Sequence, residues 1–130
     1  MKRILLKPAR KQGCKAILLG PKKDRDARMA VLETIDTELT ASGELVATEG
    51  LAVPDEATLV RGEKGGMPVT DSVFPDSKEF LLGYWIVDVQ TPERAYAIAG
   101  RISAPPGSGG VPTNMPIEVR RIASHAAKSA

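Results

Sequence analysis

The sequence predicts an α+β protein in which two helices cover one face of an antiparallel sheet. Apolar residues recur at spacings of three and four over 24–42 and again over 91–102, which is typical of amphipathic helices. Short apolar or alternating segments before, between and after them have the lengths of strands. With 130 residues, the chain has the length of one domain and can bury a core without disulfide cross-links.

Two short apolar runs compete for the place of the first strand. Residues 3–7 end at Pro8, and residues 16–19 end at Gly20-Pro21. Both have the length and the terminators of a buried strand, so the residues leave the choice open.

The first helix is expected over residues 24–42, with Gly43 as its stop. The residues expected to face the sheet are Ala27, Ala30, Val31, Ile35 and Leu39. The residues expected to face solvent are Arg28, Glu33, Asp36 and Thr37.

The middle of the chain reads as strands and a hairpin. Residues 45–51 form the next expected strand, with Leu45, Ala47 and Glu49 on one face. Segments 58–61 and 67–70 then flank the glycine-rich stretch 62–66, a hairpin signature in which glycine supplies positive φ angles. A loop and a short turn are expected over 71–80.

The strongest strand pattern lies at 81–89, and Thr91-Pro92 after it is typical of a helix start. The residues of that helix expected to face inward are Ala95, Ile98, Ala99 and Ile102. A long loop is expected over 103–114, a closing strand over 116–122 and a flexible tail over 123–130. We therefore divide the chain into a basic segment 1–23 within the same domain, a main region 24–122 and the tail.

The order of strand, helix, two or three strands, helix and strand is typical of the ferredoxin-like plan, with both helices on one face. The strand at 81–89 is apolar on both sides, since Tyr84 and Ile86 alternate with Trp85 and Val87. The face without helices therefore needs cover as well. We expect a second copy of the sheet in a symmetric dimer to provide it.

Charge is distributed unevenly. Residues 1–28 carry ten basic and two acidic side chains, a balance of +8, whereas the remainder carries eight basic and fourteen acidic ones, a balance of −6. The basic segment has no interleaved aromatic residue and no nucleic-acid motif, so we do not expect a nucleic-acid partner. The lone Cys14 and the lack of an apolar run of about 20 residues favour a cytoplasmic protein without a membrane partner.

Four stretches carry a family resemblance. They are Leu45-Val46-Ala47-Thr48-Glu49-Gly50-Leu51, Val69-Thr70-Asp71-Ser72-Val73-Phe74, Ser77-Lys78-Glu79 and Leu82-Gly83-Tyr84-Trp85. They resemble the E-G-L strand end, T-D-G-P-F loop, T-K-E turn and G-Y/F-W/Y strand of the DGPF branch of the YCII-related family. The similarity covers roughly residues 24–122. Ser72 and Val73 replace the Gly and Pro of the namesake motif, which implies a remodelled loop.

The resemblance implies a dimeric α/β barrel, made of two ferredoxin-like protomers with their sheets packed face to face. Members of the wider superfamily include cofactor-independent lyases, isomerases and monooxygenases, and also sensing modules. DGPF-type proteins are further associated with extracytoplasmic-function sigma factors. Fold alone does not decide among these roles.

Asp71 and Lys78 are the candidate catalytic residues, because they match the Asp and Lys of the family motifs. A partly desolvated carboxylate at the end of a strand can act as a general base, and Lys78 can pair with it or bind an anion. The alternatives are that Asp71 caps its loop and that Lys78 belongs to an exposed ion pair with Glu79.

The candidate ligand-binding residues are Glu49 and three members of the aromatic cluster, Phe74, Tyr84 and Trp85. Core packing is the alternative for the aromatic residues, and a solvent-facing edge position is the alternative for Glu49. Tyr84 and Trp85 point to opposite faces of their strand, so one should line the space between sheets and the other the helix layer. With one histidine, in the expected tail, and one cysteine, we expect neither a metal site nor a cofactor.

The sequence thus predicts a homodimer that binds a small organic molecule in or near its barrel. A cofactor-independent enzyme using Asp71 and Lys78 is the first alternative. A regulatory module that engages a sigma factor is the second.

Overall fold

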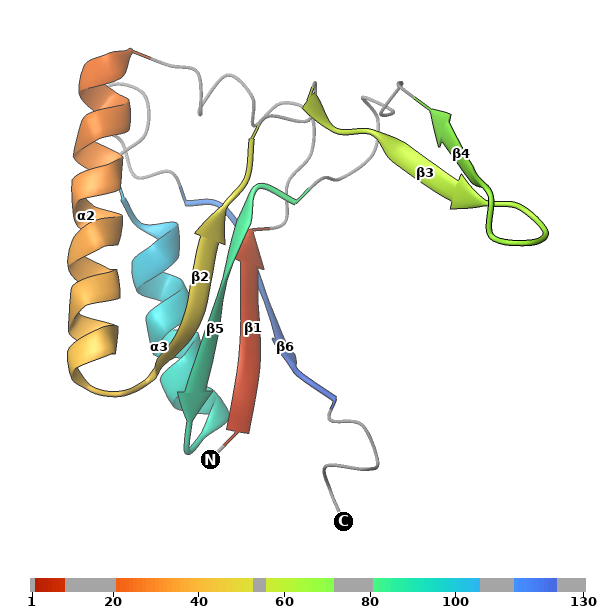
Figure 1. The fold of residues 1–130 in the computed structure, drawn as a ribbon. Coiled ribbons are helices and arrows are strands. Elements are labelled where there is room, and N and C mark those ends of the chain that lie inside the picture. The colour runs from red at the N-terminus through yellow and green to blue at the C-terminus, as the bar shows by residue number, and fades with distance from the viewer. Residues whose placement is uncertain (1, 9–20, 53–55, 72–80, 106–113, 124–130) are drawn as a thin grey trace.

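The computed structural model describes residues 2–8, 21–52, 56–71, 81–105 and 114–123, with the side chain of Asp71 left aside (Figure 1). These residues form strands and helices in the following order along the chain. They are β1 (Lys2–Pro8), α2 (Lys22–Ala41), β2 (Leu45–Gly50), β3 (Leu59–Gly62), β4 (Pro68–Asp71), β5 (Gly83–Val89), α3 (Pro92–Ser103) and β6 (Ile117–Arg121).

The main sheet has the strand order β2-β5-β1-β6, and each neighbouring pair is antiparallel. This is the ferredoxin-like arrangement, so the predicted fold class is confirmed. Of the two runs that competed for the first strand, the one around Ile4 and Leu6 forms β1. Its residues pair with both β5 and β6. The competing run 16–19 lies outside the described residues.

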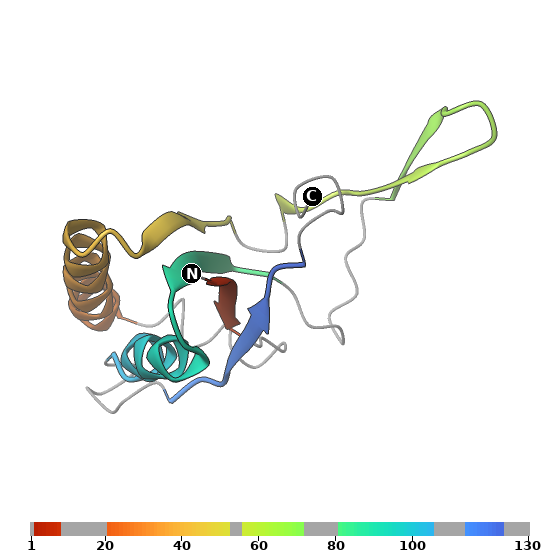
Figure 2. The ribbon, with the colours of Figure 1, turned by 90° about the horizontal axis from the view of Figure 1, so that it is seen from below.

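Both helices pack on the same side of this sheet (Figure 2). The core lies between the two layers and combines side chains from β1, β5, α2 and α3. Its members are Ile4, Leu6, Ile35, Leu39, Trp85, Val87, Val89, Ala95, Ile98, Ala99 and Ile102. The sheet face turned away from the helices is called the open face below.

Helix α3 forms as its local sequence predicts. The side chain of Thr91 accepts a hydrogen bond from the backbone N–H of Arg94 at 3.3 Å, and Pro92 occupies the first turn. The four residues expected to face inward are the four that are buried: Ala95, Ile98, Ala99 and Ile102.

Helix α2 faces the sheet with the predicted side only in its second half. Only Ile35 and Leu39 are fully buried, with Leu32 half-buried against the core, whereas Ala27, Ala30 and Val31 are exposed. Asp36, expected in solvent, is half-buried. The larger side chains decide the orientation, because burying Leu and Ile removes more apolar surface from water than burying Ala.

Strand β2 contains a register shift that the alternation pattern did not predict. Leu45 pairs with Val87, but Ala47 already pairs with Ile86, so one extra residue is inserted between them. A bulge of this kind moves the residues after it to the other face. Leu45 therefore packs toward the helices, while Ala47 and Glu49 lie on the open face.

The hairpin of β3 and β4 is confirmed, but it forms a separate two-stranded sheet that projects away from the main one (Figure 1). Its turn places Gly65 and Gly66 at φ +88° and +83°, a conformation that favours glycine. Val60 and Met67 of this hairpin are exposed. Asp71 ends β4 and pairs with Leu59.

Candidate functional site on the open sheet face

The open face carries a row of four polar side chains, one from each strand, which we call the polar row. Glu49 on β2 pairs with Tyr84 on β5, and Lys7 on β1 pairs with Glu118 on β6. The register of β1 with β5, which pairs Leu6 with Trp85, brings Lys7 opposite Tyr84 at the next position. An acid, a phenol, an amine and a second acid thus follow one another across the sheet.

Next to the polar row lies an apolar row. Ala47, Ile86 and Leu5 are joined by consecutive pairings across β2, β5 and β1, and Leu5 pairs in turn with Arg120 on β6. Ala47, Ile86 and Leu5 are half-buried. They offer an apolar surface one step along the strands from the charged groups.

The end of the polar row on β6 is an ionic cluster. Glu118 Oε2 lies 3.0 Å from Arg120 Nη2, and Glu118 Oε1 lies 3.8 Å from Lys7 Nζ. The contact with Arg120 is an ion pair without hydrogen-bond alignment, since Oε2 is shielded from solvent and has no hydrogen-bond partner among the described residues. Glu118 is therefore held between two cations.

Two donors of the polar row lack an acceptor among the described residues. Within the described part of the chain, Lys7 Nζ and Tyr84 Oη donate no hydrogen bond, although both residues are half-buried. A half-buried polar group without a partner is available to a ligand, because binding there costs little further desolvation.

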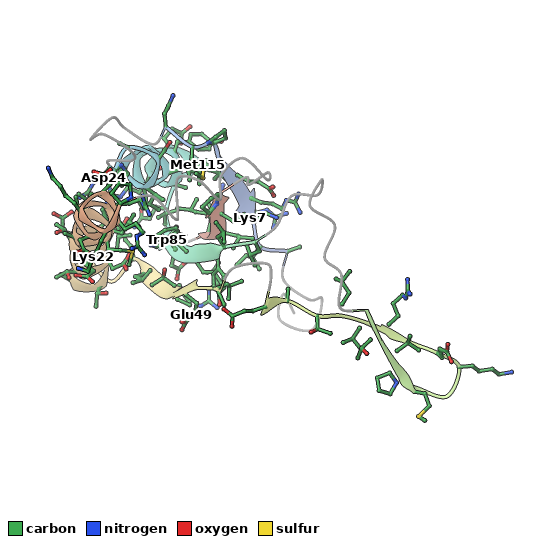
Figure 3. All side chains as sticks on the ribbon, turned by 90° about the horizontal axis from the view of Figure 1, so that it is seen from above. Lys7, Lys22, Asp24, Glu49, Trp85 and Met115 are labelled. Carbon is green, nitrogen blue, oxygen red and sulfur yellow. The ribbon has the colours of Figure 1, made fainter. Side chains whose placement is uncertain are left out.

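Of the six predicted site residues, the structure brings Glu49 and Tyr84 together on the open face. Figure 3 shows Glu49 on the side of the sheet away from the helices and Trp85 on the helix side. Trp85 packs into the core, where its Nε1 donates a hydrogen bond of 2.8 Å to Asp36 Oδ1. Tyr84 thus lines the open face and Trp85 the helix layer, as their alternation predicted.

The predicted catalytic residues Asp71 and Lys78 cannot be placed relative to the polar row from the described side chains. Asp71 is described only through its backbone at the end of β4, and Lys78 and Phe74 lie outside the described residues. Their roles stay predictions.

Sequence reasoning missed Lys7 and Glu118. Each lies between apolar residues that face the helices, Leu6 and Pro8 in one strand and Ile117 and Val119 in the other. A charged residue at such an alternating position signals a side chain on the opposite face of the sheet. That signal identifies the face, but the pairing of the two residues requires the sheet register.

A second ionic contact ties the start of β2 to helix α3. Arg94 donates two hydrogen bonds of 2.8 Å to the carboxylate of Glu44, and Ser42 Oγ donates another of 2.8 Å. These donors, above all Arg94, lower the pKa of Glu44 to about 2, and the Glu44 carboxylate in turn raises the pKa of Arg94. This pair links two elements of the fold and lies outside the polar row.

No group of three or more metal-ligating side chains lies close together among the described residues. Neither described helix combines the length and the apolar character needed to cross a membrane.

No curated protein matches the chain at a significant level. The family model of the YCII-related domain matches residues 1–118, which include β1, all four residues of the polar row and the two described helices. The chain belongs to the YCII-related domain family.

Proposed function

We propose that this protein is a homodimer that binds a small organic molecule between two open sheet faces. The observation that carries the proposal is the composition of the open face, where the apolar row lies beside the polar row. The resemblance to the DGPF branch supports the same arrangement, because it implies two sheets packed face to face.

The apolar side chains on the open face are a reason to expect a second layer over the sheet. Leu5 and Ile86 lie on the open face, on the opposite side from the helices, and are only half-buried. Apolar side chains on an open sheet are stabilised by removal from water, at roughly 25 cal/mol per Å² of buried apolar surface. A second copy of the same face supplies that cover, and the polar row keeps the enclosed space suited to a ligand with polar groups.

Light scattering tests the dimer directly. We expect a mass of twice the 13.8 kDa of the chain at micromolar concentration. A mass that stays at 13.8 kDa over this range would contradict the dimer.

Thermal-shift screening with a panel of small metabolites tests ligand binding. A compound that binds the folded state raises the melting temperature in proportion to ln(1 + [L]/Kd). We expect such a compound to lose its effect when Tyr84 is replaced by Ala. A panel in which every compound leaves the melting temperature unchanged would argue against a binding role.

A further inference from the structure

We propose that the polar row binds the carboxylate of a small organic acid, with Lys7 Nζ and Tyr84 Oη as its donors. The apolar row of Ala47, Ile86 and Leu5 then receives the rest of the molecule. This inference rests on the proposed function, because the second sheet face is what encloses the ligand. It adds the chemical class of the ligand and the residues that recognise it.

The charge of Lys7 is only partly balanced by its neighbour. Its Nζ is 3.8 Å from Glu118 Oε1, which is beyond the reach of a hydrogen bond. Glu118 has a closer cation in Arg120, at 3.0 Å. Among the described residues the three N–H donors of Lys7 thus have no acceptor and can serve an anion, while Arg120 can continue to neutralise Glu118 when a ligand arrives.

Tyr84 is placed to share that anion. Neighbouring strands lie about 4.8 Å apart, and side chains directly opposite one another on the same face have Cβ atoms about 5 Å apart. Lys7 and Tyr84 occupy such opposite positions at the centre of the four-stranded sheet. An ammonium and a phenol at this separation can each donate to one oxygen of a carboxylate.

The ends of the row restrict what else can bind. Glu49 and Glu118 are the outer members, so a second negative charge extending along the row would meet a carboxylate on either side. The free direction runs along the strands, over Ile86 and Leu5. This arrangement favours a compact monoanion with an apolar body over a dianion.

Titrations with benzoate and with its neutral counterpart benzamide test the inference, followed by NMR or calorimetry. The two probes share a ring and differ in the charge of one group. For the unmodified protein we expect benzoate to bind about tenfold or more tightly than benzamide, because a hydrogen bond to a charged group is about twice as strong as one between neutral groups.

Three variants identify the donors. We expect Lys7→Met to weaken benzoate about tenfold while leaving benzamide within about twofold, and Tyr84→Phe to weaken benzoate by about three- to tenfold. Lys64→Met, in the exposed turn of the β3–β4 hairpin, is the matched control and should leave both affinities unchanged. If Lys7→Met fails to fold, Lys7→Arg keeps the charge and should retain the preference for benzoate.

Several results would overturn the inference. One is equal affinity for benzoate and benzamide. Another is an equal loss of benzoate affinity in Lys64→Met and Lys7→Met. The third is that benzoate, phenylacetate and hexanoate all fail to bind at about 10 mM, a concentration at which even millimolar affinity is detected.

Light scattering on the same samples separates this failure from failure of the proposed function. A dimer that binds benzamide as well as benzoate would contradict the carboxylate site alone. A monomer would contradict the proposed dimer, and the effect of Lys7→Met on benzoate would still decide the carboxylate site.

Discussion

At Gly83 the backbones of β2 and β5 approach so closely that a Cβ atom would lie 2.8 Å from the carbonyl oxygen of Glu49. Since the obstacle is backbone, the two strands must separate to admit a methyl group. We predict that Gly83→Ala lowers the free energy of unfolding by about 1–3 kcal/mol. Urea titration measures this loss.

The register partner Gly50 provides the control for that experiment. A Cβ atom there would meet no atom within 4 Å, and its φ is not in the left-handed region. Gly50→Ala should therefore change the free energy of unfolding by less than about 0.5 kcal/mol. Equal effects of the two substitutions would show that the close approach at Gly83 is not what requires glycine.

The hydrogen bond from Trp85 to Asp36 joins β5 to helix α2 across the edge of the core. Trp85→Phe keeps an aromatic ring but leaves the half-buried carboxylate without this donor. We predict a loss of about 1–3 kcal/mol in the free energy of unfolding, measured by chemical denaturation. Asp36→Asn keeps an oxygen acceptor for the indole and should cost less than Trp85→Phe. A larger cost for Asp36→Asn would contradict this account.

At the scale of elements, the ion pair of Glu44 and Arg94 joins the start of β2 to the first turn of α3. The pKa of Glu44 is lowered from 4.5 to about 2. Because the pKa of Glu44 is lower in the folded state, the pair contributes fully to the free energy of unfolding at pH values above the unfolded-state pKa of Glu44. This contribution is lost as the pH falls from 4.5 toward about 2. We predict that stability decreases over this range.

Glu44→Gln tests that pH dependence. The variant should lose roughly 1–2 kcal/mol at neutral pH, a figure reduced for the partial exposure of Arg94, and should show a flatter decline in acid. Glu38→Gln is the matched control, because Glu38 of α2 pairs with Arg101, which like Arg94 lies on α3, but both side chains of this second pair are exposed. Identical pH profiles for the unmodified protein and Glu44→Gln would refute the role of Glu44.

At the scale of the whole molecule, the two outer surfaces should respond differently to a new charge. Ile86 lies on the open face, whereas Tyr96 is 58% exposed on helix α3. We predict that Ile86→Glu raises the dissociation constant of the dimer by about 100-fold or more, because each copy would place a new, unpaired carboxylate in the interface, where it loses its hydration. Tyr96→Glu should leave it unchanged. Sedimentation at several concentrations measures both, and equal behaviour would exclude the open face as the interface.

Local signals predicted much of the fold. Thr91, Pro92 and the spacing of the apolar residues predicted both the start and the buried face of helix α3. Both features depend only on residues that are neighbours along the chain. The hairpin of β3 and β4 follows in the same way from its glycines. The inward face of α2 was predicted correctly only at Ile35 and Leu39. Its alanines and its longer side chains form two overlapping stripes, and the longer side chains are the ones that pack on the sheet, because they bury more apolar surface.

The candidate site, like the fold, was predicted only where it depends on residues that are neighbours along the chain. By itself, the sequence determined the family, the α+β class and the opposite orientations of Tyr84 and Trp85, because these depend on motifs and on alternation within one strand. The tertiary structure was needed to show that Glu49, Tyr84, Lys7 and Glu118 form one row, and that Leu45 lies on the opposite face from Ala47 and Glu49. The physical reason is register: strands far apart in the chain meet through backbone pairing, and a single bulge in β2 changes which side chains face each other.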